Sequence, residues 1–174
     1  SAQLLFSAAE MKEIIPQCEE YTQYFYYGMG WQIYWLTDNR HYLLYFNVSG
    51  DFFYVGVENK QIERIFSTGL TGESIISPDR NKVGIIGIDF AAIFSLDGYQ
   101  LAITHFDPRY GTEDHYFGSI GRYWDSKSEN LLLVIPPLDK TSNIDIISLP
   151  IDNTPAIMIA QLPNRAVRIR ISPD

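Results

Sequence analysis

Residues 77–103, SPDRNKVGIIGIDFAAIFSLDGYQLAI, contain two phrases of the same design. Each begins with Ser and an Asp-containing turn, Pro-Asp at 78–79 in the first and Asp-Gly at 97–98 in the second, and each leads into a short apolar run. Pro followed by Asp, and Asp followed by Gly, are the residue pairs that tight turns favour. The stretch therefore predicts hairpins that join short β-strands.

The two phrases resemble the turn-plus-strand signature of TolB-type β-propeller blades. This resemblance implies an array of four-stranded repeats, each about 40–45 residues long. Related phrases start at Thr37, Ser77, Ser95 and Leu162, which are 40, 18 and 67 residues apart. Only the first interval fits a blade, and tight-turn chemistry explains such phrases in any β protein. We therefore expect ordinary hairpin turns and no array of blades.

Short apolar runs separated by turn residues continue through most of the chain. From Trp31 to Phe66 they predict a four-stranded antiparallel meander, and residues 42–46 and 52–55 are apolar on both faces of their strands. Such strands are covered on both sides. Residues 165–171 alternate, which indicates a strand with one wet face. The fold class predicted is mainly β (α+β), an antiparallel meander closed into a sandwich or half-barrel.

The N-terminus has the only clear helical signals. Ser7 and Glu10 fit a capping box, Met11 and Ile14 follow at helical spacing, and Pro16 ends this helix or begins a second one. We expect a single domain, residues 1–174, with a helical segment at about 7–28 and a β-rich region at about 31–172.

Charge and composition exclude several classes of function. The net charge of −8 disfavours nucleic acids and anionic membranes as partners, and it would steer a basic protein toward the chain. Cys18 is the only cysteine, so neither an intramolecular disulfide nor a cysteine metal cluster can form. The sequence has no Gly-x-Ser-x-Gly motif, no phosphate-binding loop and no long apolar span. We expect a cytoplasmic protein without a cofactor, and the sequence does not define its oligomeric state.

The densest polar cluster lies between residues 105 and 115. Its two imidazoles and two carboxylates could bind a divalent metal or exchange protons if a hairpin brought them together: His105, Asp107, Asp114 and His115. The spacing matches no known metal motif, so we expect a hydrated loop there and no metal.

Aromatic and acidic residues between positions 19 and 35 are typical of a protein-binding surface, because Tyr and Trp dominate binding hot spots and carboxylates pair with basic partners. We expect Phe25, Trp31 and Trp35 to belong to the core. The candidate partner-binding residues are Glu19, Glu20, Tyr26, Tyr27, Tyr34, Asp107, Glu113 and Asp114.

These patterns favour a non-enzymatic, acidic protein-binding module. The specific form that we expect is an immunity-type inhibitor that neutralises a basic partner such as a bacterial toxin nuclease. Two alternatives stay open: a metal-assisted or acid-base enzyme that uses the His105–His115 cluster, and an accessory β domain that binds a small molecule or sugar on an aromatic sheet face.

Overall fold

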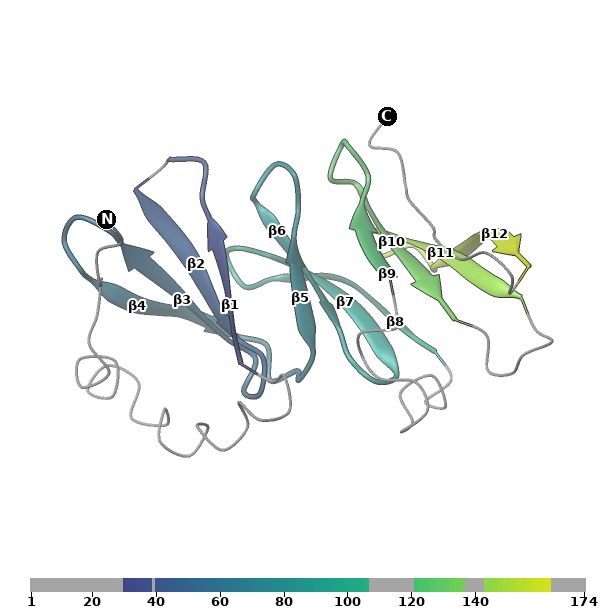
Figure 1. The fold of residues 1–174 in the computed structure, drawn as a ribbon, viewed down its shortest axis with the longest axis horizontal. Helices are drawn as coiled ribbons and strands as arrows, with labels where there is room; N and C mark the ends of the chain where they lie inside the picture. Colours follow the sequence, from purple (N-terminus) through teal and green to yellow (C-terminus); the bar gives the residue numbers. More distant parts are fainter. Residues whose placement is uncertain (1–29, 39, 107–120, 137–142, 164–174) are drawn as a thin grey trace. The chain divides into compact units, whose positions relative to one another are not determined.

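The structure is a computed structural model that describes residues 30–38, 40–106, 121–136 and 143–163. In these residues the chain forms three four-stranded antiparallel sheets, each with its strands in sequence order (Figure 1). The mainly β prediction and the meander topology are confirmed. The predicted helical segment at 7–28 and the predicted strand at 165–171 lie outside the described residues. No helix in the described part of the chain could span a bilayer.

The strands of the three sheets follow one another along the sequence. The first sheet contains β1 Trp31–Trp35, β2 His41–Phe46, β3 Asp51–Gly56 and β4 Ile62–Ser67. The second contains β5 Glu73–Ile76, β6 Lys82–Ile86, β7 Phe90–Ser95 and β8 Gln100–His105. The third contains β9 Gly121–Trp124, β10 Asn130–Ile135, β11 Ile144–Pro150 and β12 Ile157–Leu162.

This arrangement repeats one unit, a four-stranded antiparallel meander, which the expectation of ordinary hairpin turns without an array of blades did not foresee. The sheets begin at Trp31, Glu73 and Gly121, which are 42 and 48 residues apart. A four-stranded meander repeated at about this period is typical of β-propeller blades. The phrases at Thr37 and Ser77 open equivalent turns, between the first and second strands of a sheet, whereas the phrase at Ser95 opens the turn between β7 and β8. The 18-residue interval between the phrases at Ser77 and Ser95 therefore joins two different turns of one sheet and does not measure the period of the repeat.

The chain divides into two compact units, residues 1–71 and 72–174. The first unit contains the first sheet, and the second contains the other two. That the whole chain is a single domain stays a prediction.

Both faces of the first sheet are buried at its centre, as the apolar runs predicted. One face carries Tyr42, Leu44, Phe53 and Val55, and the other carries Leu43, Tyr45 and Phe52. Trp31 packs on Phe46 with ring centroids 4.5 Å apart, which agrees with its expected place in the core. The same expectation for Trp35 was wrong, since its side chain is 51% exposed. The cause is that β1 is an edge strand, with only β2 beside it in this sheet.

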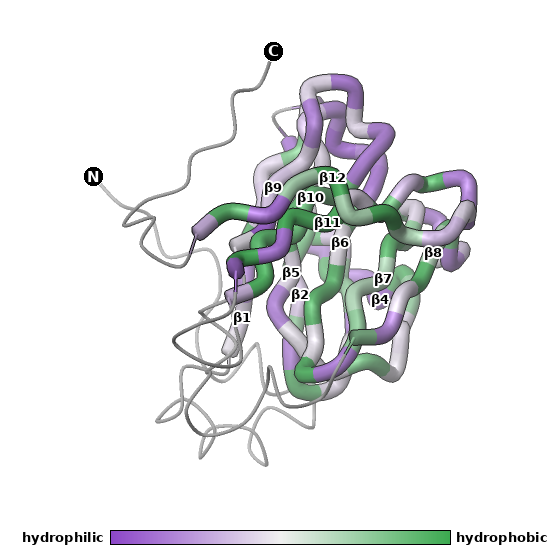
Figure 2. Tube along the Cα trace, turned by 90° about the vertical axis from the view of Figure 1, so that its right-hand side faces the viewer, coloured by the Kyte–Doolittle hydropathy of each residue, from purple (hydrophilic) through white to green (hydrophobic). Residues whose placement is uncertain are grey.

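In the second unit, the second and third sheets pack against each other through one hydrophobic cluster. Its fully buried members include Ile93 and Ala102 from one sheet and Leu131 and Leu133 from the other. Gly84 allows close approach, because a Cβ atom there would lie 2.8 Å from Leu131 Cδ2. Many strand segments are hydrophobic, and several of the hairpin turns are hydrophilic (Figure 2).

Polar contacts fix the edges of this packed pair of sheets. The Trp124 indole N–H donates to the Ile75 carbonyl at 3.2 Å, and the Asp79 amide donates to Ser128 Oγ at 3.1 Å. Arg122 and Glu73 form an ion pair across the two sheets. The two sheets are thus held in a fixed relation by apolar burial inside and by directional bonds at the rim.

Candidate functional site

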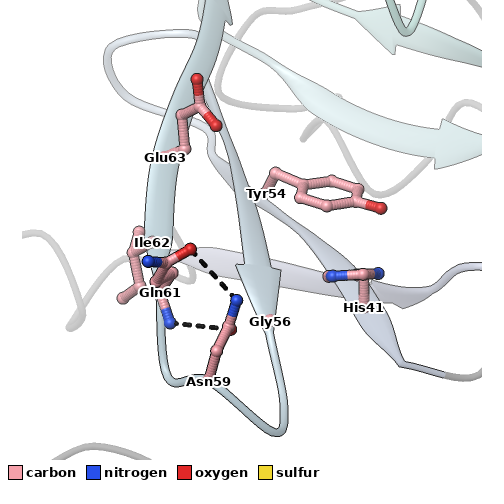
Figure 3. A pocket seen from close by; sticks show the side chains of 7 residues that line it. All are labelled: His41, Tyr54, Gly56, Asn59, Gln61, Ile62 and Glu63. Atoms are coloured by element: carbon pink, nitrogen blue, oxygen red, sulfur yellow. Dashed lines mark hydrogen bonds between the residues drawn. The ribbon is translucent and has the colours of Figure 1, made fainter.

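A pocket of about 410 Å³ lies beside the first sheet, at the end of β3 and the starts of β2 and β4. Figure 3 shows His41 and Tyr54 on one side of it and the β3–β4 hairpin, with Glu63, on the other. Its lining is polar and aromatic: His41, Tyr54, Gly56, Asn59, Gln61, Ile62 and Glu63.

Strand register brings the main side chains of this pocket together. Tyr54 pairs with Glu63 on β4 and with Leu43 on β2, and Leu43 pairs with Tyr34 on β1. Directly paired residues of antiparallel strands share one face of the sheet. Tyr34, the candidate binding residue that the structure describes, therefore belongs to the same cross-strand row as Tyr54 and Glu63. Its half-buried side chain is two strands away from Tyr54.

The β3–β4 hairpin forms one wall of the pocket, and hydrogen bonds between its own residues stabilise it. Asn59 Nδ2 donates to Gln61 Oε1 at 3.1 Å, and the Gln61 amide donates to Asn59 Oδ1, also at 3.1 Å. Gly56 makes this packing sterically feasible, because a Cβ atom there would lie 2.1 Å from Asn59 Oδ1. Lys60 at the turn has a φ of 53°, in the left-handed region.

The opposite wall is built on Asp38, in the turn before β2. Its Oδ1 atom accepts from the amides of Arg40 and His41, both at 3.0 Å. Its Oδ2 atom faces His41 Nδ1 at 2.5 Å and accepts from the Tyr54 hydroxyl at 3.3 Å. The His41 and Tyr54 rings are stacked, with centroids 4.4 Å apart. The Asp38 carboxylate thus favours the His41 tautomer with the proton on Nδ1. The Nε2 atom of the ring then faces away from Asp38.

This network shifts two pKa values. The Arg40 amide and the His41 ring and amide hold the pKa of Asp38 well below its usual range. Burial, together with the neighbouring Asp38 charge, raises the pKa of Tyr54. At neutral pH the wall therefore presents an ionised carboxylate, whose lone pairs are in use, and a protonated phenol.

The Asp38–His41 pair has a structural counterpart in the second sheet. Asp79 stands at the same place in its turn, three residues before the first residue of the following strand. It accepts from the Asn81 amide at 3.1 Å and forms an ion pair with Lys82, the residue that corresponds to His41. Asp38 is therefore a turn-stabilising residue in the first place, and its short contact with His41 follows from the geometry of the repeat.

Most of the residues proposed from the sequence cannot be placed. Tyr34 and His105 are described, and His105 is exposed at the end of β8. The others, Glu19, Glu20, Tyr26, Tyr27, Asp107, Glu113, Asp114 and His115, lie outside the described residues. Among the residues that the structure describes, no group of three or more His, Cys, Asp or Glu side chains could hold a metal ion.

The sequence analysis missed Asp38, His41, Tyr54 and Glu63. Thr37-Asp38 was visible as a turn, and the turn position of Asp38 was the only signal that it would hold His41. The pairing of Tyr54 with Glu63 depends on the length of the turn between β3 and β4. The sequence alone did not determine that length.

No family model matches the sequence, and no curated protein matches it. Among solved structures, the chain is similar to the WD40 domain of SCAP from fission yeast, with 10% identity and a TM-score of 0.50 over 82% of this chain. It also matches an uncharacterised protein of Listeria monocytogenes, with 22% identity and a TM-score of 0.49 over 70% of this chain. A third match is the periplasmic gluconolactonase of Pseudomonas aeruginosa, with 12% identity and a TM-score of 0.47 over 78% of this chain. The chain spans 36% of the first of these structures and 40% of each of the other two. The first likeness agrees with the blade-like repeat and concerns the fold alone.

Proposed function

We propose that this chain is a non-catalytic, acidic binding module that receives a Lys or Arg side chain of a basic partner protein in the pocket beside the first sheet. The observation that carries this proposal is the Tyr54–Glu63 pair. Glu63 is exposed, and its side chain has no hydrogen bond or ion pair with any described residue. It pairs with Tyr54 in the strand register, so the two side chains share one face of the sheet. A carboxylate and an aromatic side chain on the same face of a sheet suit a cation on an apolar stem.

The composition of the pocket supports binding rather than chemistry. Asp38 and His41 adopt the arrangement that the turn of the repeat requires, and no Ser, Thr, Cys or Lys side chain lines the pocket as a nucleophile. The Asn59 and Gln61 side chains are bonded to each other. Glu63 is then the charged group that a ligand can reach without breaking an existing contact.

Long-range attraction would come from the whole chain. Arg40 and Lys60 are exposed in the two turns that flank the pocket, so the local field is nearly balanced. The net charge of −8 would instead raise the association rate of a basic partner. This rate would fall as the salt concentration rises, because salt screens the attraction between the charges. An immunity-type inhibitor of a basic toxin nuclease is the specific form of this function that we propose.

The test uses an arginine-containing tetrapeptide, acetyl-Gly-Arg-Gly-Arg-amide, and amide chemical-shift mapping on the full chain. We expect shifts in residues 54–63 and weaker binding as salt rises. Glu63→Gln should weaken binding about two- to five-fold, because the carboxylate is exposed and screened. The matched control is Glu129→Gln, which removes another exposed carboxylate, from the turn before β10.

Two results would count against this function. One is a Glu63→Gln variant that binds the peptide as the unaltered chain does. The other is binding that does not change with salt, since a pairing between exposed charges must weaken when it is screened.

Acid-base catalysis is a second candidate, because His41 Nδ1 lies 2.5 Å from Asp38 Oδ2 and so resembles a carboxylate-oriented general base. If His41 acts in this way, His41→Gln should abolish a hydrolytic activity while the urea midpoint of unfolding changes little. If the pair only stabilises the turn, the substitution should lower the midpoint and no activity should be found toward activated esters.

A further inference from the structure

A second pocket, of about 310 Å³, lies in the second unit at the ends of β5 and β9, beside the β5–β6 turn. Its lining is mainly apolar and aromatic with one cation: Ile75, Ile76, Ser77, Pro78, Arg80, Tyr123 and Trp124. It is separate from the pocket proposed above to receive a basic side chain, and its charge has the opposite sign.

The walls of this second pocket are held in place by the contacts between the two sheets. Trp124 is only 8% exposed, and its indole N–H is fixed by the Ile75 carbonyl. Ser77 is 1% exposed and donates from Oγ to Asp79 Oδ1 at 2.5 Å. Asp79 also pairs with Lys82 and accepts from the Asn81 amide. Because these groups already have partners, a ligand would meet a preformed cleft with little reorganisation.

Arg80 occupies a backbone position that favours glycine. Its φ is 60°, and its amide donates to the Ser77 carbonyl at 2.9 Å. The matching turn between β7 and β8 places Gly98 there, with a φ of 86° and the same bond to the Ser95 carbonyl at 3.0 Å. A side chain is disfavoured in this left-handed region, whereas glycine is not. The turn Ser77–Arg80 thus carries a long cationic side chain at the position where the β7–β8 turn of the same sheet has Gly98.

The third turn of this type shows what such a side chain can do. Ser128, between β9 and β10, has a φ of 60° and donates its amide to the Asp125 carbonyl at 3.1 Å. Its hydroxyl accepts from the Asp79 amide and so links the two sheets. Arg80 has no such structural contact in the described residues: no described carboxylate forms an ion pair with it, and its side chain lines the pocket instead.

We propose that this pocket binds a small carboxylate with an apolar or aromatic body, with Arg80 pairing with the carboxylate and Tyr123 and Trp124 contacting the body. A guanidinium presents paired donors that match the two oxygens of a carboxylate. The apolar walls select the rest of the ligand, and the cleft volume sets its size at about ten non-hydrogen atoms, at the lower end of small-molecule sites.

The experiment uses phenylacetate as the probe, with neutral phenylacetamide as its matched analogue, and follows the Trp124 indole N–H by NMR in the full chain. We expect saturable shifts with phenylacetate and binding at least about ten-fold weaker with the amide, the size of one charge-assisted hydrogen bond. Arg80→Gly should weaken phenylacetate binding by a similar factor while the urea midpoint of unfolding stays or rises. Arg80→Gln removes the charge but keeps a polar side chain with hydrogen-bond donors, and it serves as a second variant. Lys127→Gln removes an exposed cation from the neighbouring turn and should leave binding unchanged.

Three results would overturn the proposal. The first is equal binding of the acid and the amide, which would leave only an apolar cleft. The second is unaltered phenylacetate binding in Arg80→Gly or Arg80→Gln. The third is the absence of any Trp124 shift with phenylacetate up to about 10 mM, since even one charge-assisted bond in a preformed apolar cleft gives measurable binding there.

Discussion

The packing of the second sheet on the third includes one especially close contact, and a double-mutant cycle can measure it. Leu131 is fully buried on β10, and a Cβ atom at Gly84 on β6 would lie 2.8 Å from Leu131 Cδ2. Leu131→Ala leaves a cavity between the sheets and should cost about 3 kcal/mol of unfolding free energy. Gly84→Ala forces the Leu131 side chain to move and should cost about 1–2 kcal/mol.

The double variant is the informative one. With alanine at position 131 the clash with Leu131 is gone, and the new methyl group at position 84 fills part of the cavity. The approach of that methyl group to Ile75 Cγ2, at 3.3 Å, is present in both backgrounds and cancels in the cycle. We expect the double variant to be about as stable as Leu131→Ala alone, which corresponds to a coupling energy of about 1–2 kcal/mol. Gly84→Ala also gains about 0.5 kcal/mol from its strand position, and this gain appears in both backgrounds and cancels in the cycle.

The assay is urea unfolding followed by tryptophan fluorescence. The chain has three tryptophans, and replacing Trp31 and Trp35 with Phe leaves Trp124, which belongs to the same hydrophobic cluster as Leu131. The signal then reports the second unit alone. Additive single-variant losses, within about 0.5 kcal/mol, would refute the packing described here, because residues that do not touch show no coupling.

Three further predictions concern single contacts. Burial alone would raise the pKa of Asp79, but hydrogen bonds from Lys82 and Ser77 hold this pKa below its usual range. The ionised carboxylate therefore stabilises the fold above about pH 4, and this stabilisation is lost as the pH falls further. In urea unfolding, Asp79→Asn should be less stable than the unaltered chain at pH 7 and nearly as stable near pH 2. Gly56→Ala should cost about 1–3 kcal/mol in urea unfolding through its clash with Asn59 Oδ1, and Asn59→Gly should restore most of that loss. Arg122→Met should be less stable to heat than Glu73→Leu/Arg122→Met, because the single change leaves the partly buried Glu73 carboxylate without its partner.

Much of the fold could be read from local patterns. The run from Trp31 to Phe66 predicted a four-stranded meander, and the structure has four strands there. Strand positions follow from alternation and turn residues, which are local properties. The exposure of Trp35 could not be read in this way, because it depends on β1 lying at an edge of its sheet, and edge position is a property of the assembled sheet.

The candidate pocket was beyond local patterns for a similar reason. Tyr54 and Glu63 are nine positions apart and become neighbours only through the register of β3 and β4. That register includes an irregularity between Phe52 and Phe53, which shifts the pairing of the strands. A one-residue change of register would move Glu63 to the opposite face. Tyr34, the one described residue among those expected to bind a partner, belongs to the row that the register creates.

The repeat is difficult to recognise in the sequence because turns of the same backbone geometry carry different residues at the same position. The turns that begin at Ser77, Ser95 and Asp125 share one backbone geometry, with a left-handed residue in the fourth place, yet that place is held by Arg80, Gly98 and Ser128. Glycine satisfies the backbone alone, whereas serine adds a bond between sheets and arginine adds a cation to a cleft. Where backbone hydrogen bonds stabilise the repeated turn, its side chains are not needed to hold the turn and can serve other purposes. The positions at which the sequence departs from the simplest turn chemistry are therefore the positions at which to look for function.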